Sequence, residues 1–472
     1  MRGRTTTAKV ALASVSAGQT ETTDRVAHVA RIAGRLERLP MTSYQHVIIL
    51  IVATAFFFDS MDLGAMTFTL GSIRKTFALS SADAGLLASM SFFGMAFGAA
   101  GAGMLADRFG RMVIFRVSMI LWGASSLLCG LAPDLFWLAV FRVLLGIGMG
   151  MEFPLAQSIV SEMAPASSRG RYVALLDGGW PAGFIASGIL CLIVLSFLSW
   201  RWVFILEAIP AVFVFASRRY VPESPRWLAD RGYHDQAEAT MRMIEDKVRQ
   251  RTGQPLPEPQ RIPETAARSE RAPFLALWRG EYVKRSIMVW ILWFFALLGF
   301  YGLTTWLGAL LQHAGYAVTR SVYYTVLISL AGVPGFLASA WLVEAWGRKV
   351  TCVAMLLGSA VMAYFYGSAG SVTALICFGL AMQFFMFGMW AILYAYTPEL
   401  YPTRARATGC GYASAVGRVG ALIGPAVVGI ILPVAGQAGV FTLGAGAFVL
   451  AALAVTVLGE ETKGRPLEAI SQ

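Results

Sequence analysis

Charged side chains are scarce in this chain. Only 14% of its 472 residues are Asp, Glu, Lys or Arg, whereas soluble domains average roughly 25%. A water-soluble protein of this size has too much surface to cover with so few charges. The hydrophobic residues, 57% of the chain, run in long blocks rather than in an amphipathic period. These features exclude a soluble enzyme, a disordered protein and a secreted disulfide scaffold. A β-barrel is disfavoured because its strands would alternate apolar and polar residues.

Cysteine and histidine are also few. The five cysteines lie inside apolar blocks without a CxxC pair, and the four histidines lack the spacing of metal ligands. We interpret the cysteines as small buried hydrophobes. The chain also lacks a Ser-His-Asp set and a phosphate-binding loop. We therefore expect no metal, no cofactor and no enzymatic activity.

Long apolar blocks make up most of the chain. The hydrocarbon core of a bilayer is about 30 Å thick, so a helix needs about 20 mostly apolar residues to cross it. We therefore expect an all-α membrane protein with twelve transmembrane helices. The blocks run approximately over residues 46–70, 84–106, 112–131, 135–162, 171–197, 202–217, 286–311, 321–343, 350–368, 371–397, 407–432 and 437–458.

Basic residues cluster in every second loop and in both tails. They include Arg25, Arg31, Arg35, Arg38, Arg108, Arg111, Arg169, Arg171, the run from Arg218 to Arg285, Arg348, Lys349, Arg404, Arg406, Lys463 and Arg465. The intervening loops hold only Arg74, Lys75, Arg201 and Arg320. The positive-inside rule then predicts a multi-pass protein of the cell (inner) membrane with cytoplasmic termini. The net charge of +11 follows from this topology, so no nucleic-acid partner is needed, and we expect no removable signal peptide.

The chain repeats itself. Residues 107–111 read Asp-Arg-Phe-Gly-Arg, and residues 344–348 read Glu-Ala-Trp-Gly-Arg after the corresponding block of the second half. Such repeats are typical of secondary transporters built from duplicated six-helix halves. We expect an N-terminal tail over 1–45, an N-terminal six-helix bundle over 46–217, a central cytoplasmic loop over 218–285, a C-terminal six-helix bundle over 286–458 and a C-terminal tail over 459–472.

These motifs resemble the signature of the major facilitator superfamily. Three further segments are similar to its sugar-porter-like and metabolite:proton symporter branch, namely residues 222–228, residues 398–402 with Arg406 and Gly409, and residues 461–464. The resemblance extends over residues 46–468. It implies two pseudo-symmetric six-helix bundles and transport of a small-molecule substrate by alternating access.

By resemblance, charged residues at the cytoplasmic helix ends form a gate between the halves. Exposed ion pairs contribute only about 0–1 kcal/mol each, so a network is needed to bias the equilibrium between two states. The alternative interpretation is positive-inside charge and helix caps alone. The gate residues are Asp107, Arg108, Arg111, Glu162, Arg169, Glu207, Glu223, Arg226, Glu344, Arg348, Glu399 and Arg406.

Ionisable residues also occur inside the apolar blocks, where insertion costs at least about 2.5–3.5 kcal/mol each. Asp59 and Asp62 share a helix face, and such a pair can hold one proton. Arg142 resembles the fourth-helix arginine that opposes a first-helix aspartate in proton-coupled sugar porters, and Asp62 matches that aspartate better than Asp59. We assign proton coupling to Asp59, Asp62, Arg142 and Glu152. A permanent Asp62–Arg142 pair that only stabilises the bundle is the alternative.

The substrate residues indicate a flat, partly apolar ligand. Sugar porters of this resemblance carry glutamines in the fifth and seventh helices, and both are absent here. Aromatic side chains favour a flat ligand, and a guanidinium binds a carboxylate in a bidentate manner. The expected substrate residues are Arg142, Asp177, Trp180, Trp293, Tyr301, Trp306, Gln383, Trp390, Tyr394 and Arg418.

The first-helix aspartates and the Glu152-Phe153-Pro154 segment resemble nicotinate and aromatic-acid transporters. We therefore expect proton-coupled uptake of a small heteroaromatic carboxylate such as nicotinate. The alternatives are a proton-antiport exporter of drugs or metabolites, a sugar transporter, and a non-transporting nutrient sensor. The expected partners are the lipid bilayer, the substrate and protons, and we expect a monomer.

Overall fold

The computed structural model describes residues 26–165, 168–259, 277–278, 280, 282–401 and 403–463. Within these ranges the regular structure is helical. Eleven helical stretches are long and apolar enough to cross a membrane. The last helix, α17 (Thr403–Leu458), is broken at Gly436, whose φ of 63° and ψ of −168° are not helical. Glycine adopts a positive φ at little cost, so the chain reverses there and makes the predicted twelfth crossing.

The N-terminal half contains six crossings. They are α2 (Ser43–Thr76), α3 (Ser81–Phe109), α4 (Arg111–Leu131), α5 (Leu135–Met163), α6 (Arg169–Phe197) and a sixth made of α7 (Trp200–Ala208), η1 (Ile209–Val212) and α8 (Phe213–Tyr220). The sixth crossing is interrupted at Pro210, because proline lacks the backbone N–H that an α-helix interior requires. The predicted block boundaries agree with these helices to within a few residues.

The C-terminal half repeats this arrangement. Its helices are α12 (Tyr282–His313), α13 (Val318–Ser329), α14 (Gly332–Trp346), α15 (Arg348–Gly367), α16 (Val372–Glu399) and α17. The crossing made by α13 and α14 is interrupted just before Pro334, for the same reason as the sixth.

Short polar side chains start several of these helices. The Ser80 and Asp134 side chains accept hydrogen bonds from backbone N–H groups of α3 and α5, at 3.1 and 3.0 Å. Ser371 does the same for α16 at 3.2 Å. Each replaces a partner that the first turn of a helix lacks. These caps fix the helix starts on one side of the bundle.

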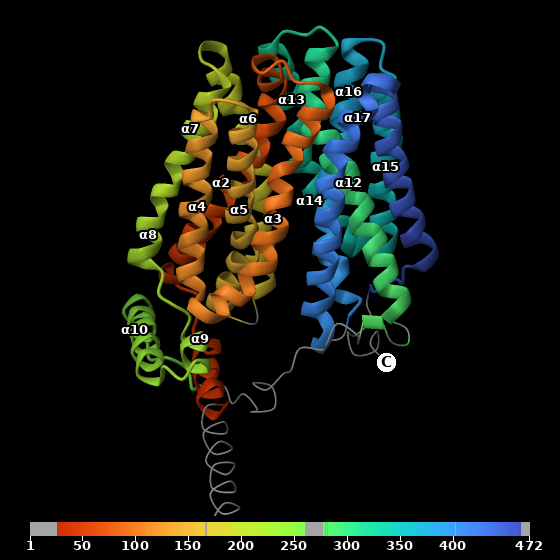
Figure 1. The fold of residues 1–472 in the computed structure, drawn as a ribbon. Coiled ribbons are helices and arrows are strands. Elements are labelled where there is room, and N and C mark those ends of the chain that lie inside the picture. Colours follow the sequence, from red (N-terminus) through yellow and green to blue (C-terminus); the bar gives the residue numbers. More distant parts are fainter. Residues whose placement is uncertain are drawn as a thin grey trace, which may run out of the picture.

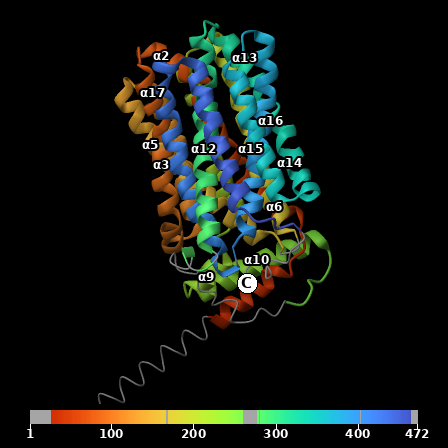
Figure 2. The same cartoon turned by 90° about the vertical axis from the view of Figure 1, so that its right-hand side faces the viewer.

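Figure 1 shows the two helical bundles side by side, and Figure 2 shows the same arrangement with the C-terminal half toward the viewer. A helix over residues 26–37, α9 (Pro225–Asp230), α10 (His234–Thr252) and the last described residues lie at one end, which we call the termini side. The polar helix α10 buries Met241 and Ile244 against Ile32 and Leu36. Residues 1–25 and 464–472 of the predicted tails, and residues 260–276 of the predicted central loop, lie outside the described residues.

The halves pack closely toward the side opposite the termini. A Cβ atom on Gly85 of α3 would lie 2.6 Å from the Pro425 carbonyl oxygen of α17, and one on Gly429 would lie 2.4 Å from the Ser81 carbonyl oxygen. Small residues permit such close helix approach inside a membrane. Toward the termini side the halves instead line a cavity of about 880 Å³, which we call the wide cavity. The molecule is therefore closed on one side and open on the termini side.

Candidate functional site

A central cavity of about 80 Å³ lies between the halves. Eight helices contribute side chains to it, namely α2, α3, α5, α6, α12, α14, α16 and α17, and the residues from α17 include Ser414 and Arg418. It shares six residues with the wide cavity, so the two are continuous. Those residues are Phe153, Asp177, Trp293, Tyr394, Ser414 and Arg418. A ligand in the central cavity thus has a route to the termini side.

Aromatic rings form the walls of the central cavity. Trp390 stacks on Tyr394 with ring centroids 5.8 Å apart, and Trp180 lies 6.1 Å from Trp390. Trp293 meets Tyr394 edge to face at 5.6 Å, and Tyr301 lies 6.0 Å from Trp390. Five of the six predicted aromatic residues therefore line one space. Its shape and polarity suit a flat ring.

Three predicted substrate residues, Trp306, Gln383 and Arg142, lie outside the central cavity. Trp306 is fully buried, and its Nε1 donates to the Pro425 carbonyl oxygen at 2.9 Å. It lies thirteen residues beyond Trp293, about 20 Å along the helix. Gln383 is fully buried, and neither end of its amide has a hydrogen-bond partner among the described residues. Neither Trp306 nor Gln383 lines the central cavity, so we withdraw both from the substrate set.

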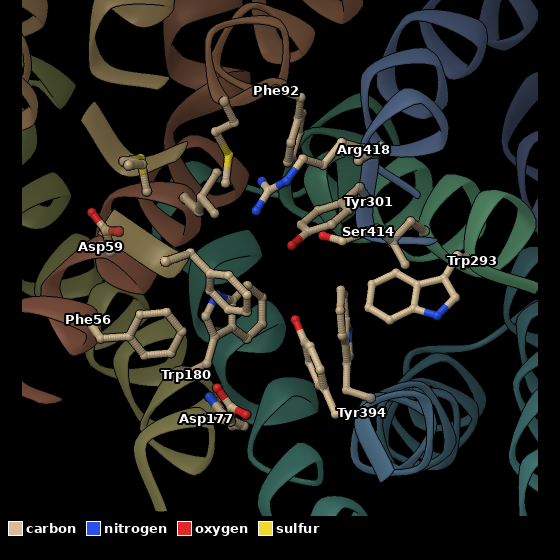
Figure 3. Close-up of a pocket in the computed structure, with 18 of the residues that line it drawn as sticks. Phe56, Asp59, Phe92, Asp177, Trp180, Trp293, Tyr301, Tyr394, Ser414 and Arg418 are labelled. Atoms are coloured by element: carbon tan, nitrogen blue, oxygen red, sulfur yellow. The ribbon is translucent and has the colours of Figure 1, made fainter. Parts of the chain in front are cut away.

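Arg418 projects its guanidinium into the central cavity (Figure 3). It makes no hydrogen bond or ion pair with any residue that the structure describes. Its guanidinium carbon lies 5.8 Å from the centroid of the Phe153 ring. The Tyr301 and Ser414 hydroxyl groups lie beside it (Figure 3). A half-buried cation without an anionic partner is costly, so this position is suited to bind an anion.

Arg142 already has an anionic partner in the structure. Its Nη1 pairs with Asp62 Oδ1 at 2.9 Å, and the two side chains are 1% and 0% exposed. Asp62 does not line the central cavity, and Arg142 borders only a void of about 10 Å³. The pair closes on itself inside the N-terminal half, so Arg418 is the arginine available to a ligand.

Three other acids of the same half lie at or near the cavity. Asp59 lines the central cavity but is only 5% exposed, and its Oδ1 has no hydrogen-bond partner among the described residues. Glu152 is fully buried behind it, where Oε2 accepts from Trp122 Nε1 at 2.8 Å and Oε1 lacks a partner. On α6 of the same half, Asp177 Oδ1 accepts from Gln157 Nε2 at 3.2 Å. The cavity thus carries two carboxyl groups and one guanidinium.

Glu207 does not lie at the gate. It is 2% exposed on α7, where Oε1 accepts from Ser187 Oγ at 3.0 Å. It lies in the electrostatic field of Asp62 and Arg142. The prediction that placed it in the gate is corrected: the break at Pro210 separates it from the termini side, and it belongs to the buried polar residues of the N-terminal half.

On the termini side, the N-terminal half carries a network at the start of α4. Arg111 forms an ion pair with Glu162, which also accepts a hydrogen bond from the Ser224 hydroxyl. Glu223 accepts from the backbone N–H groups of Arg111 and Met112 at 3.0 and 3.1 Å. A carboxylate at a helix N-terminus is favoured by the partial positive charge there.

The C-terminal half carries the matching network at the start of α15. Arg348 pairs with Glu399 at 3.0 Å, and the Thr462 hydroxyl donates to Glu399 at 2.5 Å. Glu461 accepts from the backbone N–H groups of Arg348 and Lys349 at 2.8 and 3.0 Å. Burial opposes ionisation of Glu461, but its backbone hydrogen bonds outweigh burial and lower its pKa below the ordinary value. The duplicated sequence motifs therefore fold into duplicated contacts.

The remaining predicted gate residues divide into paired and exposed groups. Arg169 and Arg226 both pair with Glu37 of the N-terminal helix, at 2.5 and 2.6 Å. Four more have the following positions: Glu344 pairs with Arg348 at 3.0 Å, Arg406 Nε donates to the Pro398 carbonyl oxygen at 3.0 Å, and Asp107 and Arg108 are exposed. Each of the ion pairs named here joins residues of the same half.

The chain is similar to known membrane proteins along nearly its whole length. Residues 46–472 match the family described as sugar (and other) transporter. The chain belongs to this family. It is therefore a multi-pass membrane transporter of the major facilitator superfamily and not an enzyme. It is 36% identical over 440 residues to a niacin transporter, NiaP, of Acinetobacter baylyi, covering 93% of this chain and 99% of that one.

The chain is also similar to a second curated transporter and to a solved structure. A putative niacin/nicotinamide transporter, NiaP, of Bacillus subtilis is 30% identical over 419 residues, covering 89% of this chain and 96% of that one. The partially occluded inward open structure of the xylose transporter XylE from E. coli superimposes with a TM-score of 0.73 at 21% identity, covering 90% of this chain and 100% of that one. The latter shows the shared fold.

Sequence reasoning missed two polar residues of the site. Ser414 lies one helical turn before Arg418 and lines both cavities. Gln157 bonds Asp177 and lines the wide cavity. Their signals were available: a hydroxyl four residues from a membrane arginine shares its helix face, and Gln157 is a polar side chain inside an apolar block.

Proposed function

We propose that this transporter carries out proton-coupled uptake of a small heteroaromatic carboxylate such as nicotinate. One observation carries the proposal: Arg418 lies without an anionic partner in a cavity walled by aromatic rings. Two relatives bear names that include niacin. A carboxylate on Arg418 and an aromatic ring against Trp180 and Trp390 use both features of the cavity together.

The cavity favours an aromatic acid over a sugar. A guanidinium offers two parallel N–H donors to one carboxylate, and flat rings stack well between indole and phenol side chains. Sugars need many amide and hydroxyl partners. The chain contains no asparagine, and among the described residues no glutamine lines the central cavity.

Transport follows from alternating access between the halves. The positive-inside rule assigns the termini side to the cytoplasm, so the structure corresponds to the state that exchanges ligand with the cytoplasm. The networks around Glu162 and Glu399 lie where the halves must meet when that side closes. Exposed Asp107 and Arg108 are available to bond the other half in the closed state. We further propose an inner-membrane monomer with cytoplasmic termini.

The decisive experiment measures uptake of radiolabelled nicotinate into cells that express the transporter, at two external pH values. We expect faster uptake at the lower external pH, with competition by unlabelled nicotinate and benzoate but little by nicotinamide, which lacks the carboxylate. Arg418→Gln removes a charged hydrogen bond, which is worth about 1.5–3 kcal/mol, so it should weaken binding by about ten-fold or more.

Two variants serve as controls. Arg418→Lys keeps the charge but lacks the planar fork, so its affinity should lie between those of the wild type and Arg418→Gln. Arg249→Gln alters an exposed arginine of α10, paired only with Asp246 at 3.0 Å, and should leave uptake unchanged. Unaltered nicotinate uptake by Arg418→Gln, or equal competition by nicotinamide and nicotinate, contradicts the proposal. Faster efflux from preloaded cells at low external pH, with no uptake, indicates an exporter.

A further inference from the structure

Asp59 is the carboxyl group that shares the cavity with the unpaired guanidinium. It lies on the wall facing Arg418 (Figure 3) and is more than nine-tenths buried. No hydrogen bond satisfies its Oδ1 among the described residues. The two side chains interact electrostatically without forming an ion pair. Asp59 is thus a carboxyl group held in the field of a cation that it does not touch.

Asp62 differs from Asp59 in both respects. Its charge is neutralised directly by Arg142 at 2.9 Å, and it has no surface in the central cavity. A buried ion pair is expensive to break, because removal of one partner leaves the other charge uncompensated. A ligand that arrives at Arg418 therefore changes the surroundings of Asp59 directly and those of Asp62 only at a distance.

Charged and titratable groups around Asp59 come from several helices packed at the cavity. They are Asp62 on α2, Arg142 and Glu152 on α5, Asp177 on α6, Glu207 on α7, Tyr301 on α12, Tyr394 on α16 and Arg418 on α17. Arg142 is occupied by Asp62, so Arg418 is the one unpaired cation in this group. Any anion that binds Arg418 removes the compensating charge from Asp59.

We propose that Asp59, rather than Asp62, takes up the transported proton, and that the substrate carboxylate triggers this uptake by occupying Arg418. This rests on the proposed function. When a carboxylate anion binds Arg418, the low-dielectric cavity gains one negative charge and Asp59 loses the charge that compensated it. Protonation of Asp59 by one proton from water restores the original net charge. A carboxylate can only accept hydrogen bonds, whereas a carboxylic acid also donates one, so the proton also gives Asp59 a donor it lacked.

The arrangement explains coupling in charge terms. Binding adds one substrate anion and one proton, so the occupied cavity carries the same charge as the empty one. Either species alone leaves an uncompensated charge inside the membrane, which is strongly disfavoured. Only the empty and the doubly loaded cavities are then favourable for the switch between the two states.

The test measures proton uptake when nicotinate binds the purified full-length transporter in weakly buffered detergent solution. A pH-indicator dye reports protons, and quenching of tryptophan fluorescence reports binding. We expect about one proton per bound nicotinate for the wild type. Asp59→Asn, which has the same shape without the charge, should bind nicotinate with no proton uptake and with an affinity that no longer depends on pH. Asp62→Asn and the matched cavity variant Asp177→Asn should keep proton uptake.

Each result decides between the alternatives. Undiminished proton uptake by Asp59→Asn overturns the proposal but leaves nicotinate binding intact. Loss of uptake in Asp62→Asn or Asp177→Asn, with binding retained, assigns the proton to that residue and also overturns it. If Asp59→Asn does not fold, retained uptake in both of those variants and in Glu152→Gln supports Asp59 by elimination, and its loss in any of them refutes it. A wild type that binds no nicotinate refutes the proposed function itself.

Discussion

At the residue scale, two arginines with similar sequence surroundings have opposite roles in the structure. Arg142 is neutralised by Asp62 and excluded from the ligand space, whereas Arg418 faces that space without an anion. The buried acids around them show the same division. Glu152 accepts a hydrogen bond from Trp122, while Asp59 Oδ1 has no hydrogen-bond partner among the described residues. The partners of each ionisable group, rather than its position in an apolar block, determine what it can do.

The Trp122–Glu152 hydrogen bond leads to a prediction about stability. Trp122→Phe leaves a fully buried carboxyl without its donor, which costs about 1–3 kcal/mol. We expect the midpoint of thermal unfolding in detergent to fall. Trp390→Phe is the matched control, because Trp390 Nε1 has no partner among the described residues. An equal drop for both variants would show that ring packing, not the hydrogen bond, sets the cost.

At the element scale, glycines determine how closely the helices pack. A Cβ atom on Gly98 of α3 would lie 2.1 Å from the Ile147 carbonyl oxygen of α5, and one on Gly94 would lie 2.1 Å from that of Val143. These contacts involve backbone atoms, which cannot move aside as a flexible side chain can. The α3–α5 pair therefore depends on two positions one turn apart, as in other small-residue membrane interfaces.

A pair of alanine substitutions on α3 tests this packing. Gly98→Ala should separate the helices and destabilise the protein by about 1–3 kcal/mol. Gly103→Ala adds a methyl group where no atom lies within 4 Å. It should be neutral or slightly stabilising, because alanine favours helix by about 0.5–1 kcal/mol over glycine. Thermal unfolding of both variants checks the expectation, and a stable Gly98→Ala protein would show that the helices repack.

The N-terminal helix is held on α10 by charge. Arg35 pairs with Glu238 at 2.7 Å and with Glu245 at 2.6 Å, and Arg38 pairs with Glu245 at 2.5 Å. Burial opposes ionisation of both glutamates, but the hydrogen bonds from the arginines outweigh it and lower the pKa of Glu238 and of Glu245. The sequence analysis assigned this segment to the N-terminal tail; the structure shows that residues 26–37 form a helix that packs on α10.

These lowered pKa values set the pH dependence of the contact. A carboxyl whose folded pKa lies below its unfolded value stabilises above the unfolded value of 4.5 and loses that stabilisation as the pH falls through the folded value. We expect the protection of residues 26–37 against hydrogen exchange, taken relative to the intrinsic rate at each pH, to be high at pH 7 and lower below about pH 4. Glu245→Gln should show the lower protection already at pH 7, whereas Asp246→Asn, at an exposed neighbour, should not. Protection that is independent of pH would contradict this account.

At the scale of the whole molecule, the halves meet on one side and separate on the other. Close contacts between α3 and α17 lie toward the side opposite the termini, and the wide cavity lies toward the termini. Within the described residues, the ion pairs at the starts of α4 and α15 each join residues of the same half. Each half can therefore move as a unit while its internal network remains intact.

Cys410 reports this arrangement directly, because it lines the wide cavity. A membrane-impermeant thiol reagent should label it in inside-out vesicles and not in intact cells. Nicotinate should protect it by filling the cavity above it. Cys410→Ala should abolish the protected signal. Labelling of Cys410 from the outside of intact cells would reverse the assigned orientation.

The sequence by itself determined the crossings and the duplicated motifs, and it predicts their orientation. A bilayer forces long apolar runs on each helix that crosses it, and loop charges follow the membrane asymmetry, so both are visible without a structure. The motifs that end in Arg111 and Arg348 could be matched to each other from the sequence, because each follows the end of an apolar block. The choice among the candidate cavity residues could not be made in this way.

Only the tertiary structure showed that Arg418 faces the cavity while Arg142 is paired with Asp62. It also showed that Trp306 and Gln383 lie outside the cavity and that Glu207 is buried within the N-terminal bundle. A helix that is apolar all round carries no periodic signal for the face that meets a cavity. That face is set by the helices packed against it, such as α3 against α5 and α17. The fold could therefore be predicted from local composition, whereas the site depends on contacts between residues far apart in the chain.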